Sequence, residues 1–389
     1  MPVKWLKPQL VCEVKFTEQR GVKSLRHPIF ADLREDKKAV SEKDEKIVKL
    51  LKGIVRKDAV RKPIVKKVKV KNEKLNNDKQ LLPADSTEEL LKINGRELKL
   101  TNLNKIYWPR EKITKRDMLN YYYSMMPFIL PYMKDRPQSL NRHPNGISKP
   151  NFYQKNVEGK VAEWIETYAY ISESDGEKKQ FLVCADEATL MYIANLGCIE
   201  MNPWHSRTRS PDNPDWCVID LDPDDNPFDQ VIEAALVVKK ILDSVGIDAY
   251  CKTSGATGIH IYIPLAAKYS YEQSRLLAQL VVDFAHQQML SSTSIERTPA
   301  KRKKKIYLDF LQNRSIQTIA APYSLRPKPG ATVSTPLHWE ELKKGLTPQD
   351  FTIYNIHDRL KNEGDIFKSV LDKGINLENA VEKITKQIK

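Results

Sequence analysis

The chain has 389 residues, of which 41% are hydrophobic, and it carries a formal net charge of +14 at pH 7. This length and apolar content suit one large domain with smaller appendages, and no apolar run is long enough to span a membrane. The five cysteines lack the CxxC spacing of zinc sites, so we expect a reducing, cytoplasmic compartment and no structural zinc. The N-terminus does not resemble a secretory signal.

The first 37 residues are too short to form a domain of their own. They nevertheless contain two β-like runs, at residues 10–16 and 24–30, which predict a short and incomplete β segment at residues 1–37.

Residues 38–85 are predicted to be a flexible basic linker. Residues 37–79 hold 16 basic and 6 acidic side chains, and no aromatic side chain lies between Phe30 and Tyr107. Such a segment has little to bury, and it would bind nucleic acid through charge without sequence preference. We therefore place the main domain at residues 86–389.

The main domain contains alternating strand and helix patterns. Residues 216–222 form an apolar run, residues 227–246 have apolar side chains at helical spacing, and residues 250–263 hold two more strand-like runs. A helical pattern at residues 271–290 precedes a last apolar run at residues 305–311. This order predicts an α+β core, in which a mixed sheet is flanked by helices and carboxylates converge on one sheet face. Further helices, expected to be scaffold, lie at residues 115–130 and 187–196.

Asp220 and Asp222 stand one residue apart at the end of the first of these strands, just before Pro223. Residues i and i+2 of a strand point to the same face, and two carboxylates there repel each other unless a cation lies between them. Mg²⁺ and Mn²⁺ prefer such oxygen ligands and often serve phosphoryl chemistry. An acidic turn without a metal also fits, since Asp and Pro are common turn formers.

Residues 254–258 separate two apolar runs, and their glycines allow backbone N–H groups to approach an anion closely. His260 follows, placed to donate to a phosphate oxygen, although an ordinary hairpin with a half-buried histidine fits the pattern as well. Asp309 lies inside an otherwise apolar run, where a lone charge is costly unless it is paired or bound to a metal.

Three segments together resemble the motifs of archaeo-eukaryotic primases: residues 220–223 (DLDP), 254–260 (SGATGIH) and 309–313 (DFLQN). Flanking segments, including residues 100–105 (LTNLNK) and 323–326 (YSLR), resemble more narrowly the polymerase domain of bacterial DNA ligase D, an enzyme of non-homologous end joining. Three ordered motifs with such flanks are far more specific than any one of them.

The resemblance implies a role for each matching residue. Asp220, Asp222 and Asp309 are implied to hold two divalent cations, Mn²⁺ or Mg²⁺, which would lower the pKa of the primer 3′-hydroxyl and neutralise charge on the triphosphate. A further set is implied to hold the incoming NTP or dNTP: Ser254, Gly255, His260 and Arg326.

One position departs from the family pattern, because Asn202 stands where most relatives have a histidine. An asparagine amide can donate a hydrogen bond but cannot carry a positive charge. We therefore expect a weaker or differently tuned contact with the triphosphate. Whether the nearby His205 takes the place of that histidine is left open by the sequence.

The resemblance also implies contacts with DNA. Asn102, Lys105 and Lys115 match the site that grips a 5′-phosphate on the downstream side of a gap, and such contacts position nucleic acid without reading its sequence. Phe152 and Tyr153 match a pair of aromatic side chains that stack on template bases. Solvated lysines and core-filling aromatic residues are the alternatives.

Residues 26–37 resemble the last motif of the oligonucleotide-binding fold that ends ATP-dependent DNA ligase domains. The sequence contains no adenylation module before them, so we expect no ligase activity. We expect the chain to be an engineered fragment, a split gene product or a late start within a larger enzyme.

We therefore expect a bacterial, nucleoid-associated, template-directed nucleotidyltransferase that fills gaps and extends 3′ ends at DNA breaks, and the resemblance implies a preference for ribonucleotides. The expected partners are gapped or broken DNA with a 5′-phosphate, Ku, and a separate or split ligase, with no membrane. Two alternatives stand beside this hypothesis. One is an inactive adaptor that binds 5′-phosphorylated ends, and the other is a replicative primase.

Overall fold

The computed structural model describes residues 85–171 and 176–388 continuously, together with residues 81–83, positions 49 and 53, and four short strands near the N-terminus. The chain divides into two compact units, Val60–Ile375 and a smaller one that combines Met1–Ala59 with Asn376–Lys389. Most of the predicted linker at residues 38–85 lies outside the described residues.

Besides the helical positions 49 and 53, the described part of the smaller unit consists of two strand pairs and one helix. Strand β1 (Cys12–Lys15) pairs antiparallel with β4 (Ile29–Leu33), and β2 (Glu18–Arg20) pairs antiparallel with β3 (Ser24–Arg26). The helix is α7 (Leu377–Ile388). The β-like runs predicted near the N-terminus therefore contain strands.

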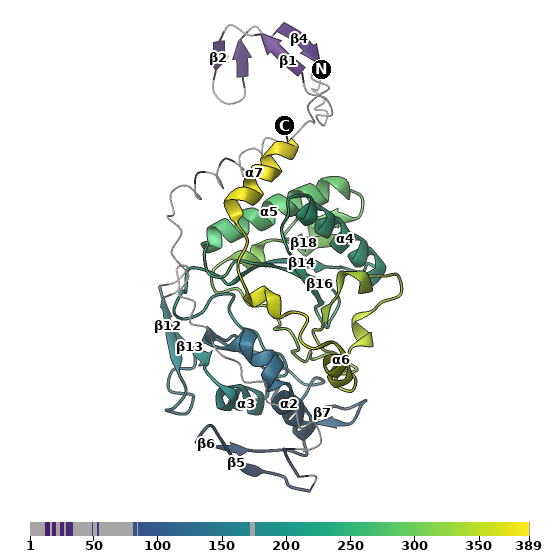
Figure 1. Ribbon diagram of the computed structural model, residues 1–389. Helices are drawn as coiled ribbons and strands as arrows, with labels where there is room; N and C mark the ends of the chain where they lie inside the picture. The colour runs from purple at the N-terminus through teal and green to yellow at the C-terminus, as the bar shows by residue number, and fades with distance from the viewer. Residues whose placement is uncertain are drawn as a thin grey trace. The chain divides into compact units, whose positions relative to one another are not determined.

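A six-stranded sheet forms the centre of the larger unit (Figure 1). Its strands lie in the order β17-β18-β14-β16-β15-β19, and all neighbours are antiparallel except the parallel pair β17–β18. The predicted mixed sheet flanked by helices is confirmed. The strands are β14 (Trp216–Asp222), β15 (Tyr250–Thr253), β16 (Ile259–Pro264), β17 (Thr293–Ser294), β18 (Ile306–Asp309) and β19 (Pro336–Leu337).

Two amphipathic helices, α4 (Phe228–Ser244) and α5 (Tyr271–Gln288), pack against β14 (Figure 1). Cys217 points toward α5, because its Sγ lies 3.5 Å from the carbonyl oxygen of Ser274. Side chains alternate between the two faces of a strand, so Asp220 and Asp222 point to the face opposite Cys217. The helices therefore cover one face and leave the carboxylates on the other, as predicted.

The other helices of the larger unit surround smaller sheets. Helix α2 (Lys115–Met133) begins at Thr114, whose side chain forms a capping box with Asp117, and α2 packs against α3 (Glu187–Asn195). Both helices confirm the helical patterns predicted at residues 115–130 and 187–196. The strands here are β5 (Glu89–Ile93), β6 (Arg96–Leu100), β7 (Ile106–Trp108), β8 (Ile113–Thr114), β9 (Arg136–Pro137), β10 (Leu140–Arg142), β11 (Phe152–Gln154), β12 (Thr167–Ile171) and β13 (Lys178–Cys184).

The hydroxyl of Tyr122 on α2 joins two loops that are distant in the sequence. It donates to the carbonyl oxygen of Ile199 and accepts from the backbone N–H of Leu325 at 3.1 Å. Because Tyr122 is fully buried, this junction fixes the positions of the residues that follow, Glu200 and Arg326. Short helices complete the unit: η1 (Pro299–Lys301), η2 (Leu311–Asn313), η3 (Trp339–Glu341), η4 (Pro348–Asp350), α6 (Ile356–Glu363) and η5 (Lys368–Leu371).

Among the described residues, no helix combines the length and the apolar character that crossing a membrane requires.

Candidate functional site

Four ionisable side chains form one row across the sheet. The strand register pairs Lys252 with His260, His260 with Asp220, and Asp220 with Asp309. Directly paired residues of neighbouring strands point to the same face. The register therefore brings Asp220 and Asp309 together with His260, and Asp222 lies on the same face one step along β14. We call these four positions the charged row: Lys252, His260, Asp220 and Asp309.

The carboxylates of the site are destabilised in their charged form. Burial, followed by the charges of Asp309 and Asp222, raises the pKa of Asp220 to about 8. Burial is also the main cause that raises the pKa of both Asp222 and Asp309. A divalent cation between them would offset this repulsion, and three carboxylates are the oxygen ligands that Mg²⁺ and Mn²⁺ prefer. By the type of its donors the set therefore suits the metal site predicted from the sequence, although the three carboxylates do not all lie within 4.8 Å of one another in this structure.

The turn between β15 and β16 depends on two glycines. Gly255 has a φ of +69°, and a Cβ there would lie 2.7 Å from the backbone nitrogen of Ser334. A Cβ on Gly258 would lie 2.2 Å from the carbonyl oxygen of Leu221, at the end of β14. Only glycine allows this close approach, so the turn is held directly beside the aspartates.

The N–H groups of this turn point at one hydroxyl oxygen. The Oγ of Ser254 accepts from the backbone nitrogens of Ala256, Thr257 and Gly258 at 3.1, 3.1 and 2.9 Å. Three converging donors form the kind of concave site that binds an anion. The turn thus has the geometry of an anion site, with the Ser254 hydroxyl as its acceptor in this structure, and its binding of phosphate stays a prediction.

Arg326 is held beside this turn by a buried carboxylate that the sequence interpretation did not single out. Its Nε lies 3.1 Å from Oε2 of Glu200, and it also donates to the carbonyl oxygen of Ser254. The other oxygen of Glu200 accepts from the amides of Asn141 and Asn202 at 3.0 and 3.2 Å. Burial raises the pKa of Glu200, but Arg326 and the two amides outweigh it and leave this pKa below its usual value.

Asn202 is buried, and its amide is directed to Glu200. His205 is fully buried, and burial, followed by the charge of Arg136, lowers its pKa to about 3. A neutral histidine enclosed in this way is not placed to supply the charge of the histidine that Asn202 replaces. Asn202 therefore acts on the candidate site indirectly, because its amide donates to Glu200 and Glu200 holds Arg326.

The three residues predicted to bind a 5′-phosphate gather near the start of α2. The Nζ of Lys115 donates to the carbonyl oxygen of Thr101 at 2.8 Å and to Oδ1 of Asn195 at 2.7 Å, and burial, followed by the charges of Lys105 and Arg142, lowers its pKa to about 8. Lys105 donates to two acceptors in the loop after β10, namely the carbonyl oxygen of Pro144 and Oδ1 of Asn145. Asn102, with a φ of +58°, lies next to Thr101.

Phe152 and Tyr153 remain exposed, at 46% and 61% of their surface, on β11. Arg142 on the paired strand β10 lies with its guanidinium 5.3 Å from the centre of the Phe152 ring. Exposed adjacent aromatic residues do not fill the core, which removes the alternative of a packing role. Their position on one short strand suits stacking on bases.

The comparisons with known proteins agree with this geometry. Residues 114–367 match the family described as LigD, primase-polymerase domain. This chain belongs to that family. It therefore contains a DNA-directed nucleotidyltransferase domain of the LigD type, on the α+β fold predicted from the sequence. Residues 1–37 match the family described as ATP dependent DNA ligase C terminal region, as the N-terminal motif suggested.

The LigD polymerase domain of this chain resembles several proteins of bacterial end joining. It is 33% identical over 286 residues to the bifunctional non-homologous end joining protein LigD of Bacillus subtilis, a match that covers 72% of this chain and 46% of that protein. The multifunctional LigD of Mycolicibacterium smegmatis is 28% identical over 69% of this chain and 35% of its own length. The chain thus spans less than half of the relatives that it matches.

A solved structure shows the same fold. The polymerase domain of Mycobacterium tuberculosis ligase D, in complex with DNA, matches with a TM-score of 0.66 and 26% sequence identity. The match covers 72% of this chain and 99% of that domain.

Two side chains of the basic run at residues 301–305 form ion pairs with carboxylates at or near the candidate site, which the sequence did not indicate. Arg302 lies 3.9 Å from Asp222, with its guanidinium 3.8 Å from the centre of the Tyr307 ring, and Lys304 lies 3.6 Å from Asp225. Two charges of the run therefore compensate neighbouring carboxylates. The sequence did not reveal these two contacts, because contacts between separate segments depend on how the strands pair.

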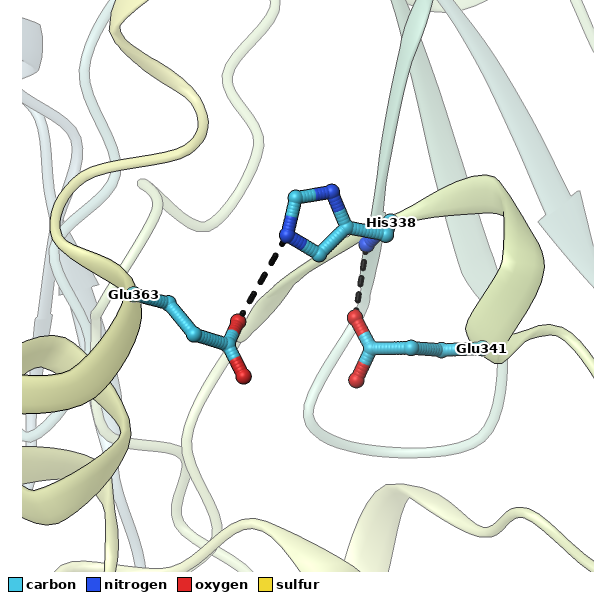
Figure 2. A group of neighbouring side chains, drawn as sticks. All are labelled: His338, Glu341 and Glu363. Atoms are coloured by element: carbon cyan, nitrogen blue, oxygen red, sulfur yellow. Dashed lines mark hydrogen bonds and ion pairs between the residues drawn. The ribbon is translucent and has the colours of Figure 1, made fainter.

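A second group of possible metal ligands consists of side chains at the start of η3, in η3 and at the end of α6. Among the described residues, His338, Glu341 and Glu363 are the one group of three whose ligand atoms lie within 4.8 Å of one another (Figure 2). Arg359 already donates to both glutamates, with its Nη2 2.6 Å from Glu341 and 3.1 Å from Glu363. A metal ion would have to compete with this guanidinium, so the group is better explained as an ion-pair network.

Proposed function

We propose that residues 86–389 extend 3′ ends and fill gaps at DNA breaks by template-directed nucleotidyl transfer. The observation that carries this proposal is the convergence of Asp220, Asp222 and Asp309 on one sheet face, beside the glycine turn, in a chain of the LigD polymerase family. Such an arrangement supplies metal ligands and an anion site side by side, which phosphoryl transfer requires.

In the proposed mechanism the three aspartates hold two divalent cations, Mn²⁺ or Mg²⁺. These cations would lower the pKa of the primer hydroxyl and offset the charge of the triphosphate. Arg326, fixed by Glu200, presents its guanidinium to a phosphate oxygen. His260 is proposed to contact the triphosphate through its Nε2, which lies 3.4 Å from Oδ1 of Asp220.

The DNA is proposed to lie across α2 and β11. Lys105 and Lys115, with Asn102, would hold the 5′-phosphate of the downstream strand, while Phe152 and Tyr153 would stack on template bases. Burial is the main cause that lowers the pKa of Lys115, and the neighbouring charge of Lys105 adds to it. A phosphate dianion would relieve the repulsion between the two charges, which supports a terminal phosphate as the ligand.

Further features of the proposal rest on the family alone. They are a preference for ribonucleotides, recruitment through Ku, and ligation by a separate or split ligase. We also propose that residues 1–37 are a remnant of a ligase oligonucleotide-binding fold and that this chain does not itself seal nicks. Incubation with ATP and nicked DNA tests the last point, because sealed product would refute it.

The primary test is extension of a gapped duplex in the presence of Mn²⁺, with and without a 5′-phosphate, using ribonucleotides and deoxyribonucleotides in parallel. Synthesis that is stimulated by the phosphate and lost in Asp220→Ala/Asp222→Ala would support the proposal. Phosphate-dependent binding without synthesis would identify an adaptor of DNA ends, and synthesis without any primer would identify a primase.

A further inference from the structure

Asn141 is a buried asparagine on β10 whose amide contacts two separate segments of the chain. Its Nδ2 lies 3.0 Å from Oε1 of Glu200, and its Oδ1 lies 2.6 Å from Nδ2 of Asn151. Asn151 directly precedes β11, the strand that carries the exposed aromatic pair. Asn141 therefore connects β11 to the carboxylate that holds Arg326.

The charge of Glu200 fixes the direction of these hydrogen bonds. Glu200 forms an ion pair with Arg326, and an ionised carboxylate has only acceptors. The Nδ2 of Asn141 must therefore face Glu200, which leaves its Oδ1 to accept from Asn151. Reversal of either asparagine amide would bring two acceptors together, so the contacts have a single favourable arrangement.

The same set of contacts continues to the glycine turn. The Nε of Arg326 lies 3.1 Å from Oε2 of Glu200, and the guanidinium also donates to the carbonyl oxygen of Ser254. Hydrogen bonds shielded from water are costly to leave unmade, and both Asn141 and Glu200 are buried. We call these four residues the Asn141 network: Asn151, Asn141, Glu200 and Arg326.

Tyr153 lies on the same side of β11 as this network. It pairs directly with Asn141 across β10 and β11, and directly paired residues point to the same face. Burial, followed by the charge of Glu200, raises the pKa of Tyr153, while the charge of Arg326 opposes that rise. The aromatic surface proposed to stack on template is thus close to the residues that position Arg326.

We propose that Asn141 is a positioning residue that couples β11 to Arg326, so that template and nucleotide bind cooperatively. Template bases on β11 restrict the movement of Asn151 and, through the Asn141 network, that of the guanidinium. Nucleotide bound to Arg326 favours template binding in return, because coupling between two sites is reciprocal. The two ligands rest on the proposed function, whereas the hydrogen bonds of the network do not.

The first test is NMR of side-chain amides in protein labelled with ¹⁵N-asparagine. The signals of Asn151 and Asn202 are identified by their loss in Asn151→Ala and Asn202→Ala. Asn141→Leu should shift both signals, because it removes the acceptor of Asn151 and the group that shares Oε1 of Glu200 with Asn202. Asn362→Ala, at an exposed asparagine, should shift neither. If either signal is unchanged in Asn141→Leu, the network does not exist in solution and the proposal is overturned.

The second test measures the coupling by calorimetry. The ligand is adenosine 5′-(α,β-methylene)triphosphate with Mn²⁺, which cannot be incorporated, and its Kd is determined with and without saturating single-stranded oligo-dC. Oligo-dC offers bases for stacking but does not pair with adenine, so a change in Kd does not come from base pairing. In the unaltered chain, oligo-dC should lower the Kd about 3- to 10-fold, the usual range for the net gain from one hydrogen bond.

Asn151→Ala separates positioning from a merely structural role. Asn151 is exposed, so this variant should keep both the melting temperature and the Kd without DNA, and lose only the gain caused by oligo-dC. Asn141→Leu should lose this gain as well, and the double variant should lose no more than either single one. A gain that persists in both single variants, or that is lost equally in Asn362→Ala, would refute the coupling.

Failure of the proposed function would have a different outcome. The unaltered chain would then bind neither the nucleotide analogue nor oligo-dC, which would refute the coupling together with that function. The amide signals would still show whether Asn141 connects Asn151 to Glu200.

Discussion

The charged row and the lysines near α2 are both proposed to act on phosphate groups, but they are built differently. The row lies on adjacent strands, so its geometry follows from backbone pairing, and its carboxylates are in mutual repulsion. Lys105 and Lys115 come from a loop and a helix start, and each donates to protein oxygen atoms. A bound cation would therefore relieve the repulsion between the carboxylates of the row. The lysines, in contrast, can replace their hydrogen bonds to protein oxygen atoms by contacts with an anion.

The largest effect is expected from Asp220→Ala. Loss of this proposed metal ligand should lower extension by about 1000-fold or more, since several kcal/mol of charge stabilisation are lost with it. Binding to a 5′-phosphorylated end should be kept, because that site is separate. Primer-extension assays and fluorescence anisotropy measure the two quantities. Asp225→Ala, at an exposed carboxylate after the same strand, is the matched control, and equal losses in both variants would contradict the assignment.

The next effect is expected from Glu200→Gln, which removes the charge that holds Arg326. The KM for nucleotide should rise about 10- to 100-fold, as is typical when a hydrogen bond between charged groups is lost. Steady-state kinetics with varied nucleotide provide the measurement. Glu163→Gln, at an exposed glutamate, should leave KM unchanged, and an unaltered KM in Glu200→Gln would remove Glu200 from the site.

Lys115→Met tests the other side of the comparison. Stimulation by a 5′-phosphate should fall about 10-fold, because one charge-assisted contact is lost, while extension of an unphosphorylated substrate should not change. Since the pKa of Lys115 is lowered to about 8, the stimulation should also decline as the pH rises above 8. Lys115→Arg should abolish that decline, and Lys99→Met, at an exposed ion pair, should resemble the unaltered chain.

Phe152→Ala should weaken binding to the template overhang by about 1–3 kcal/mol, the usual value for stacking of one base. Titration of a fluorescent single-stranded overhang measures it. Tyr354 is similarly exposed, at 67%, so Tyr354→Ala controls for loss of an exposed aromatic side chain. If both variants bind alike, Phe152 does not stack on the template.

The smallest effect concerns stability and pH. The pKa of Asp220 is raised to about 8 in the folded state, so the folded protein binds a proton that the unfolded chain has already released. Without divalent cations, stability should therefore fall as the pH rises from about 4 to 8. Since 18% of the side chain is exposed, we expect a change of about 1–2 kcal/mol, less than the full shift implies. Denaturant unfolding should show a steeper slope in the unaltered chain than in Asp220→Asn, in which the raised pKa values of Asp222 and Asp309 still contribute.

The sequence predicted the strands, helices and aspartates well because these rest on local patterns. Alternation placed Asp220 and Asp222 on one face, and helical spacing located α4 and α5. It did not predict Glu200 or the contact of Arg302 with Asp222, since each acts through a partner that only the sheet register or a loop junction brings near. A buried glutamate carries no signal of its own in a single sequence.

The order in which the row is assembled has a consequence for synthesis of the protein on the ribosome. Asp220 and His260 belong to neighbouring strands that can pair early, but Asp309 joins only after α5 and β17 have been made. Pairing between strands so distant in the sequence closes a long loop and is slow. Arg326 is made later still, so the site proposed to bind nucleotide is not complete on a nascent chain until most of the domain has left the ribosome.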